Sequence, residues 1–194
     1  MIIDRNAVPK DVFEKIEAIC NCASKDKSRK TINYVKLHVE RGQKFLVSTD
    51  GKCLGIYDVT HSKLFDFMTA LRCRMYRVEK VNKSRIVLDD CTATYDSVFP
   101  NWKKLSPDLG EYSKLIALSD KFSDSNYAQL LYALAKKNYN PISLDLFSKV
   151  KAVMGETSVY AHPTDSGKPI ILNWGDFRWI AKPTHFAESC QKEE

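Results

Sequence analysis

Glycine and proline are scarce in this chain, at seven residues each of 194. Low-complexity disorder is excluded, because aromatic residues reach 11% and apolar residues 44% of the composition. No uncharged apolar run approaches the ~20 residues that a membrane-spanning helix needs. Charged residues between Asp4 and Asp11 interrupt the N-terminus before the apolar core of a secretory signal could form. We therefore expect a folded, cytoplasmic protein with no membrane partner.

Catalytic and metal-binding motifs are missing as well. The four histidines show no HExxH or HxH spacing: His38, His61, His162 and His185. The chain has no glycine-rich phosphate loop and no GxSxG nucleophile motif. Asp89 and Asp90 are adjacent, so a strand would point their carboxylates to opposite faces. We expect no enzyme activity, no cofactor and no metal site; the alternative is an enzyme whose histidines and carboxylates converge only in the fold.

The cysteines lack the spacing of a disulfide framework. There are six: Cys20, Cys22, Cys53, Cys73, Cys91 and Cys190. A chain of this length buries a core without cross-links, so we expect four buried and two half-exposed thiols, reduced in a reducing cytoplasm. Cys20 and Cys22 fall in a predicted helix, where side chains two residues apart point about 200° from each other. They are therefore not expected to bind one metal ion.

Hydrophobic periodicity divides the first hundred residues into two similar units. The predicted order is helix 10–24, strands 31–40, 44–50 and 52–59, helix 61–73, and strands 75–81, 84–90 and 91–98. Arg41-Gly42 and Asp50-Gly51 are typical of hairpin turns between the strands. Helices that each return to an antiparallel sheet predict an α+β fold with the helices on one sheet face.

The remainder of the chain is predicted to begin with a proline-containing segment and to be richer in helix. After residues 99–110, helices are predicted over 111–122, 123–138 and 143–155, followed by strands 158–164, 168–174 and 177–183. Pro141 separates two of the helices, and Gly155 is placed to end the last one. The polar residues 187–194 are expected to form a frayed tail.

Basic residues gather at the ends of the predicted helices, and the formal net charge is +6. The residues concerned are Lys25, Lys27, Arg29, Lys30, Arg72, Arg74, Lys136, Lys137, Lys149 and Lys151. One interpretation is compensation of the helix dipoles, which favour cations at C-termini. The other is a basic layer that contacts a nucleic-acid backbone. No motif for sequence-specific reading accompanies these residues, so the second interpretation predicts non-specific binding to double-stranded DNA.

Three segments, in order, resemble parts of the sliding clamps that form the beta subunit of bacterial DNA polymerase III. Val47–Leu54, VSTDGKCL, is similar to the family's "ATDGHRLA" strand-turn-strand. Phe99–Pro107, FPNWKKLSP, resembles "FPDYRRVLP", and residues 168–172 with 177–183 look like the closing strands. The resemblance implies DNA-clamp-like repeats of helix plus antiparallel strands. It divides the chain into a clamp-like domain 1–107, a shortened, helix-enriched clamp-like domain 108–186 and the tail 187–194.

The resemblance also implies a peptide-binding cleft between the two domains. Its matching positions are Thr49, Gly51, Leu54, Pro100, Lys104, Leu105 and Pro183. Short apolar walls with a few polar anchors suit a small hydrophobic peptide. Cys53 stands where the family has arginine, and Lys182-Pro183-Thr184 replaces its closing Met-Pro-Met. The alternative is that these residues only hold the two domains together.

The function implied is that of a clamp-like, DNA-associated processivity factor from a phage or plasmid, acting in DNA replication or repair. It would bind duplex backbone non-specifically and recruit DNA polymerase or other clamp-binding proteins through the cleft. A six-domain ring would need three two-domain chains, which makes a homo-oligomer one expectation. The alternative is a monomeric or dimeric protein-binding adaptor that has the clamp-like fold without encircling DNA.

Overall fold

A single antiparallel sheet organises the protein in the computed structural model. The structure describes residues 1–26, 28–29, 31–62, 73–91, 99–105, 113–117, 124–136, 142–153, 158–162 and 169–182. Within these ranges ten strands form the sheet: β1 Ile2–Asp4, β2 Tyr34–Glu40, β3 Gln43–Thr49, β4 Cys53–Asp58, β5 Cys73–Val81, β6 Arg85–Cys91, β7 Ser113–Ala117, β8 Ser158–His162, β9 Ile170–Trp174 and β10 Phe177–Ala181. The helices of the described residues are α1 Lys10–Cys22, α2 Trp102–Leu105, α3 Asp124–Lys136 and α4 Leu144–Ser148, with short 3-10 helices η1 Arg5–Ala7 and η3 Lys151–Val153.

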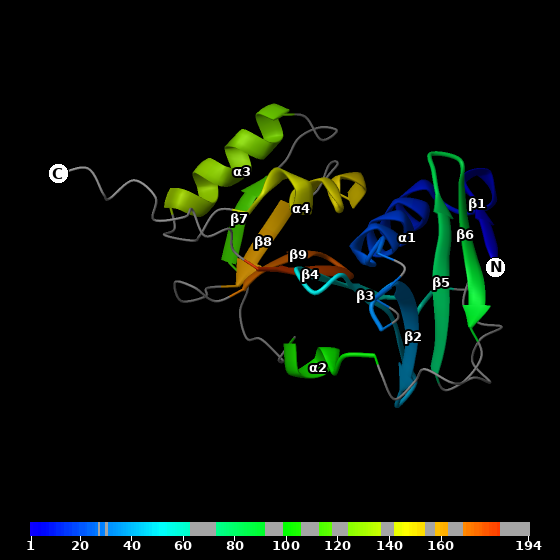
Figure 1. Cartoon of the computed structure of the whole chain (residues 1–194). Coiled ribbons are helices and arrows are strands. Elements are labelled where there is room, and N and C mark those ends of the chain that lie inside the picture. The colour runs from blue at the N-terminus through cyan, green and yellow to red at the C-terminus, as the bar shows by residue number, and fades with distance from the viewer. Residues whose placement is uncertain are drawn as a thin grey trace.

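The strand order joins the first and last parts of the chain into one sheet. It runs β1-β6-β5-β2-β3-β4-β10-β9-β8-β7, so β1 and β7 are the edges (Figure 1). The junction is the antiparallel pair β4 and β10, with Leu54 opposite Ile180 and Tyr57 opposite Phe177. Two segments more than a hundred residues apart are therefore fixed in register by backbone hydrogen bonds.

Each face of this sheet carries its own apolar layer. Along β4, Cys53 and Tyr57 point into a core shared with α1, α3 and α4, whereas Leu54 and Ile56 point into a second cluster with Phe99 and Trp102. This alternation follows from the two-residue period of a strand. Figure 1 shows α1, α3 and α4 on one side of the sheet and α2 on the other. We call the two sides the helix face and the opposite face.

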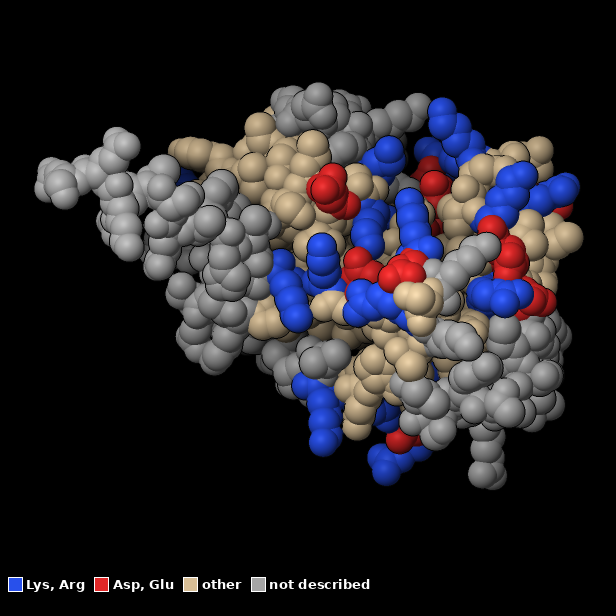
Figure 2. Space-filling view, in the orientation of Figure 1, with Lys and Arg blue, Asp and Glu red and all other residues tan. Residues whose placement is uncertain are grey.

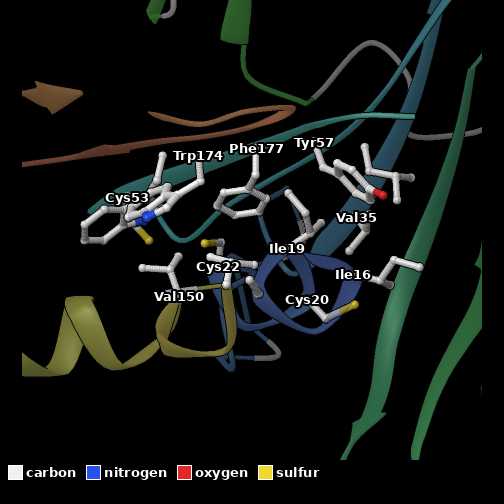
Figure 3. Close-up of a cluster of buried hydrophobic side chains, with 14 of the residues drawn as sticks. Ile16, Ile19, Cys20, Cys22, Val35, Cys53, Tyr57, Val150, Trp174 and Phe177 are labelled. Carbon is white, nitrogen blue, oxygen red and sulfur yellow. The ribbon is translucent and has the colours of Figure 1, made fainter. Parts of the chain in front are cut away.

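Helix α1 lies close against β4 because of one glycine. Its buried side includes Phe13, Ile16 and Ile19 (Figure 3). A Cβ atom added at Gly55 would lie 3.1 Å from both Cys22 Sγ and Ile19 Cδ1, so a larger residue there would force the helix away from the strand. The Ser48 hydroxyl also donates a hydrogen bond to the Ile19 carbonyl, which satisfies a backbone acceptor near the end of the helix.

The α+β class and most of the predicted elements are confirmed. The helices expected over 10–24 and 123–138 are α1 and α3, and the three closing strands are β8, β9 and β10. The helix expected over 143–155 is divided into α4 and η3; the Ser143 side chain accepts a hydrogen bond from the Leu146 amide at its start. Residues 63–72 of the helix expected over 61–73, residues 92–98 of the last strand of the first unit, and Gly155 lie outside the described residues.

The helix predicted over 111–122 is wrong where the structure describes it. Ser113–Ala117 is strand β7, which pairs antiparallel with β8 through an irregular register between Lys114 and Ile116. A short apolar run such as Leu115-Ile116 fits a helix or a strand equally. The segment is a strand because it pairs with β8, which lies about 40 residues further along the chain. Strand β1 was not expected either, because three residues show no period; it forms by pairing Ile3 with Ile86 of β6.

Candidate nucleic-acid interface

The turn between β3 and β4 is built by its own side chains. Asp50 Oδ1 accepts hydrogen bonds from the backbone amides of Lys52, at 2.7 Å, and Cys53, at 2.8 Å. Thr49 Oγ1 accepts one from the Gly51 amide at 3.0 Å and donates to the Cys53 carbonyl at 2.6 Å. Gly51 has φ of +87°, a left-handed conformation that glycine adopts without strain. The sequence Thr-Asp-Gly-Lys-Cys thus specifies a rigid turn.

An ion pair ties this turn to the segment after α4. Lys149 Nζ lies 2.6 Å from Asp50 Oδ2, and the two side chains are only 21% and 14% exposed. Burial by itself would raise the pKa of Asp50, but the hydrogen bonds from Lys149 and the two backbone amides outweigh it and hold the pKa below its ordinary value. Burial opposes the charge on Lys149 too, yet the bond to Asp50 raises its pKa above the usual value. The pair is therefore charged over a wide pH range.

Arg29 binds the same turn from the segment that follows α1. Its Nη1 donates to the Asp50 carbonyl at 2.9 Å, and Nη2 lies 3.1 Å from the place where a Gly51 Cβ would be. Arg29 remains exposed while making these contacts. Three segments distant in sequence, around residues 29, 50 and 149, consequently meet at one point.

Further cations lie on the segments that adjoin this meeting point. Lys52 belongs to the turn, and its carbonyl accepts a hydrogen bond from the Lys182 amide at 2.9 Å. Lys151 lies on η3, which packs against α1, and its charge acts on Glu17. We define the basic cluster as Arg29, Lys52, Lys149, Lys151 and Lys182. Figure 2 shows basic side chains, with acidic ones between them, in the middle of the molecule, over the region where α4, η3 and the end of α1 approach the β3–β4 turn.

The predicted DNA-contacting residues are distributed unevenly over the structure. Arg29 and Lys149 both contact Asp50, Lys151 follows Lys149 two residues later on η3, and Lys25 is exposed on the same segment as Arg29. Lys136 ends α3, and no contact described by the structure joins it to the cluster; Arg74 is on strand β5 rather than at a helix end. Four predicted positions lie outside the described residues: Lys27, Lys30, Arg72 and Lys137.

Lys52 and Lys182 were missed in the sequence. Neither lysine lies at a helix end, because Lys52 immediately precedes β4 and Lys182 immediately follows β10. The signal that could have found them is the pairing of β4 with β10, which places the residues flanking Cys53 and Ala181 side by side.

A cleft of about 660 Å³ opens next to Lys25. It lies between the end of α1 and β5, and Arg77 and Lys80 also line it. Asn33 also lines the cleft and is 8% exposed. Arg77 is held by Glu79 and by Asp89, whose Oδ2 is 2.8 Å from Arg77 Nη2.

Two of the seven residues expected in a peptide cleft are engaged in the interior. Thr49 and Leu54 are 5% and 3% exposed, the first bonded within its turn and the second packed in the apolar layer of the opposite face. Gly51 forms the turn, Pro100 is half-buried, Lys104 is exposed on α2, Leu105 ends α2, and Pro183 lies outside the described residues. The structure does bring the segment 99–105 against β4, since Phe99 and Leu54 share one cluster.

A groove of about 530 Å³ is open beside that segment. Phe45, Ile56 and Trp102 supply its apolar part, and the rings of Phe45 and Trp102 lie 5.6 Å apart. Charged side chains at its rim include Asp58 and Arg178. This groove lies on the opposite face, because Phe45, Ile56 and Trp102 belong to the apolar cluster of that face.

Some kinds of site are absent from the part of the chain that the structure describes. No three histidine, cysteine or acidic side chains come together there in a way that could hold a metal ion. Within the same ranges, no helix is both long and apolar enough to cross a bilayer.

Within the described residues, one continuous antiparallel sheet carries α1, α3 and α4 on one face and α2 on the other (Figure 1), which is an α+β architecture. Sequence comparison adds nothing further, because no family profile and no curated protein matches the chain.

Comparison with solved structures shows which proteins share the fold. The DNA polymerase III beta subunits of Borrelia burgdorferi and Thermotoga maritima are similar to it, each with a TM-score of 0.52, at 15% and 14% identity. They cover 95% and 96% of this chain, and 62% and 65% of their own chains are matched. The DNA polymerase sliding clamp of Bacillus subtilis is similar at a TM-score of 0.50 and 10% identity, covering 91% of this chain and 63% of its own. The chain thus spans slightly less than two thirds of the clamp subunits, and its clamp-like fold is confirmed.

Proposed function

We propose that this chain is a clamp-like, DNA-associated protein that binds the backbone of duplex DNA without reading its sequence. The observation that carries the proposal is the basic cluster. Arg29, Lys52, Lys151 and Lys182 are exposed, and they come from the segments that meet at or flank a turn tied down by the Asp50–Lys149 pair. A group of exposed cations on a rigid frame suits a phosphate backbone, whose negative charges repeat at short spacing.

Salt dependence provides the direct test. Binding of a fluorescent duplex of random sequence, followed by anisotropy, should weaken steeply between about 50 and 200 mM salt. The variant Lys52→Gln/Lys151→Gln/Lys182→Gln removes three exposed cations, so the slope of log K against log salt should fall by about 2.7 if each one contacts a phosphate. A flat salt profile in the unmodified protein would refute the proposal.

A matched control removes the same charge elsewhere. The variant Lys10→Gln/Lys83→Gln/Lys103→Gln alters exposed lysines at the start of α1, in the β5–β6 hairpin and on α2. We expect it to retain the slope of the unmodified protein. An equal loss of slope in both triple variants would show that net charge, and not the basic cluster, determines binding.

If the chain has two clamp-like domains, three chains would supply the six domains of a ring, and we propose that assembly. The ring would recruit DNA polymerase or other clamp-binding proteins. Support for it comes from the clamp-like fold and from a sheet with two edges, β1 and β7, which could pair between copies. Light scattering with and without a nicked circular duplex tests it. Trimers retained on circles but lost from linear DNA support the ring, whereas monomers contradict it.

The charge on α1 favours a second candidate, a protein-binding adaptor with the same fold. Lys10 lies 3.9 Å from Glu14, and Lys15 lies 3.8 Å from Asp11 and 2.6 Å from Asp176. Among the described residues, helix α1 therefore offers neutralised lysines instead of a basic layer. A protein that is monomeric or dimeric and indifferent to DNA would support the adaptor.

A further inference from the structure

Two cysteine thiols meet beneath the Asp50 turn. Cys22 is the last residue of α1 and Cys53 is the first residue of β4, and their side chains share a hydrogen bond. Both are buried, at 0% and 3% exposure, and both are free thiols. Figure 3 shows the sulfur atoms turned toward each other, with Cys20 turned away from them.

The ion pair of the turn lies beside this dithiol. The charges of Lys149 and Asp50 both act on Cys22, and the Cys53 thiol acts in turn on Lys149. The hydrogen bond with Cys53 and burial raise the pKa of Cys22 well above its ordinary value, so the closed protein holds the Cys22 thiol neutral and unreactive. A transient opening of the turn would expose them next to a lysine ammonium, which favours the thiolate that reacts.

We infer that Cys22 and Cys53 form a redox-sensitive pair, converted to a disulfide by small-molecule disulfides such as oxidised glutathione. The thiolate of one cysteine attacks a sulfur of the oxidant and releases one reduced glutathione. The second thiolate then attacks the mixed disulfide, forms the Cys22–Cys53 bond and releases another reduced glutathione. Each cysteine loses one proton, and the two electrons pass to the oxidant.

The bond would join the end of α1 directly to the start of β4. Arg29 follows Cys22 in the chain and Lys52 precedes Cys53, so the disulfide would restrain both segments that bring cations to the basic cluster. It would also close a loop of the chain between α1 and β4, and cross-links of this kind stabilise by restricting the unfolded chain. The inference rests on the two thiols alone and stands whether or not the protein binds DNA.

Peptide mapping of the full chain tests the pairing. The protein is incubated with excess oxidised glutathione, remaining thiols are alkylated, and the digest is analysed by mass spectrometry without reduction. We expect a peptide pair joined through Cys22 and Cys53, lighter than the reduced pair by two hydrogen atoms, with Cys20 alkylated. The midpoint of thermal unfolding should rise by about 5–10 °C and return on reduction. Cross-linking through Cys20 to the same extent, or Cys22 and Cys53 recovered only alkylated or glutathionylated, would overturn the inference.

Cys20 supplies the matched control, since it is buried on the same helix two residues away. Cys20→Ser should keep the oxidation-dependent rise in melting temperature, whereas Cys22→Ser and Cys53→Ser should abolish it. The peptide map of the unmodified chain decides the matter even if a serine variant folds poorly.

Discussion

Removing both partners of the Asp50–Lys149 pair should destabilise the protein less than the sum of the two single removals. Lys149→Met retains an apolar stem but leaves the Asp50 carboxylate half-buried without its cation, and Asp50→Asn leaves Lys149 without its anion. Loss of one member of a fully buried pair costs about 3–5 kcal/mol. Because these side chains retain 21% and 14% exposure, we expect about 2 kcal/mol for each single variant.

Urea unfolding followed by circular dichroism measures these changes as a double-mutant cycle. In Asp50→Asn/Lys149→Met no uncompensated charge remains, so its loss should be smaller than the sum of the single losses by about 1 kcal/mol or more. The amide oxygen of the asparagine can still accept the two backbone hydrogen bonds of the turn, which isolates the ion pair from the turn itself. Single losses that add to within about 0.5 kcal/mol would refute the reasoning.

The same ion pair should make the stability of the fold depend on pH. The pKa of Asp50 is lowered in the folded state, so its contribution is present above the ordinary aspartate pKa and is lost as the pH falls through the folded value. The pKa of Lys149 is raised, so its contribution is present below the ordinary lysine pKa and is lost as the pH rises through the folded value. The destabilisation caused by Lys149→Met should therefore be constant near neutral pH and shrink in acid.

Three other substitutions test the packing. Gly55→Ala places a Cβ 3.1 Å from Cys22 Sγ and Ile19 Cδ1, and should lower the free energy of unfolding by about 1–3 kcal/mol in urea titrations; no change would mean that α1 can move freely from β4. Gly51→Ala must adopt φ of +87° and should cost about 1 kcal/mol or more, with a lower thermal midpoint as the readout. Tyr127→Phe removes the 2.7 Å hydrogen bond to the Ile142 carbonyl and should lower the free energy of unfolding by about 1 kcal/mol. Calorimetry should show a lower midpoint of thermal unfolding, and an unchanged midpoint would contradict the prediction.

The sequence predicted those elements whose signal is local. Helix α1 combines a long apolar stripe with a proline before its first turn, and the β3–β4 hairpin is marked by Asp50-Gly51. Both the helix and the hairpin are indicated by residues that are close together in the sequence. The clamp-like fold could be inferred because three such local motifs occur in the family's order.

What could not be predicted depends on contacts between distant residues. Strand β1 has three residues and exists through its pairing with β6, while β7 takes its form from β8. The contact between Asp50 and Lys149 spans 99 positions, and no period or motif indicates it. Lys149 could therefore be recognised as a cation at a helix end, but its partner and its partial burial could not.

Lys149 and Lys151 are alike in the sequence, as lysines of one predicted helix, but they differ in burial and in ion pairing. Lys149 is held by Asp50 and half-buried, whereas Lys151 is exposed two residues later. If the basic cluster binds duplex DNA on a frame fixed by the ion pair, Lys149→Met should reduce stability and leave the salt slope of binding nearly unchanged, since its charge is already compensated by Asp50. Lys151→Gln should lower the salt slope of DNA binding by about 0.9 and leave the free energy of unfolding nearly unchanged. A salt slope that falls equally in both variants would mean that Lys149 leaves Asp50 to bind phosphate, and that the ion pair belongs only to the free protein.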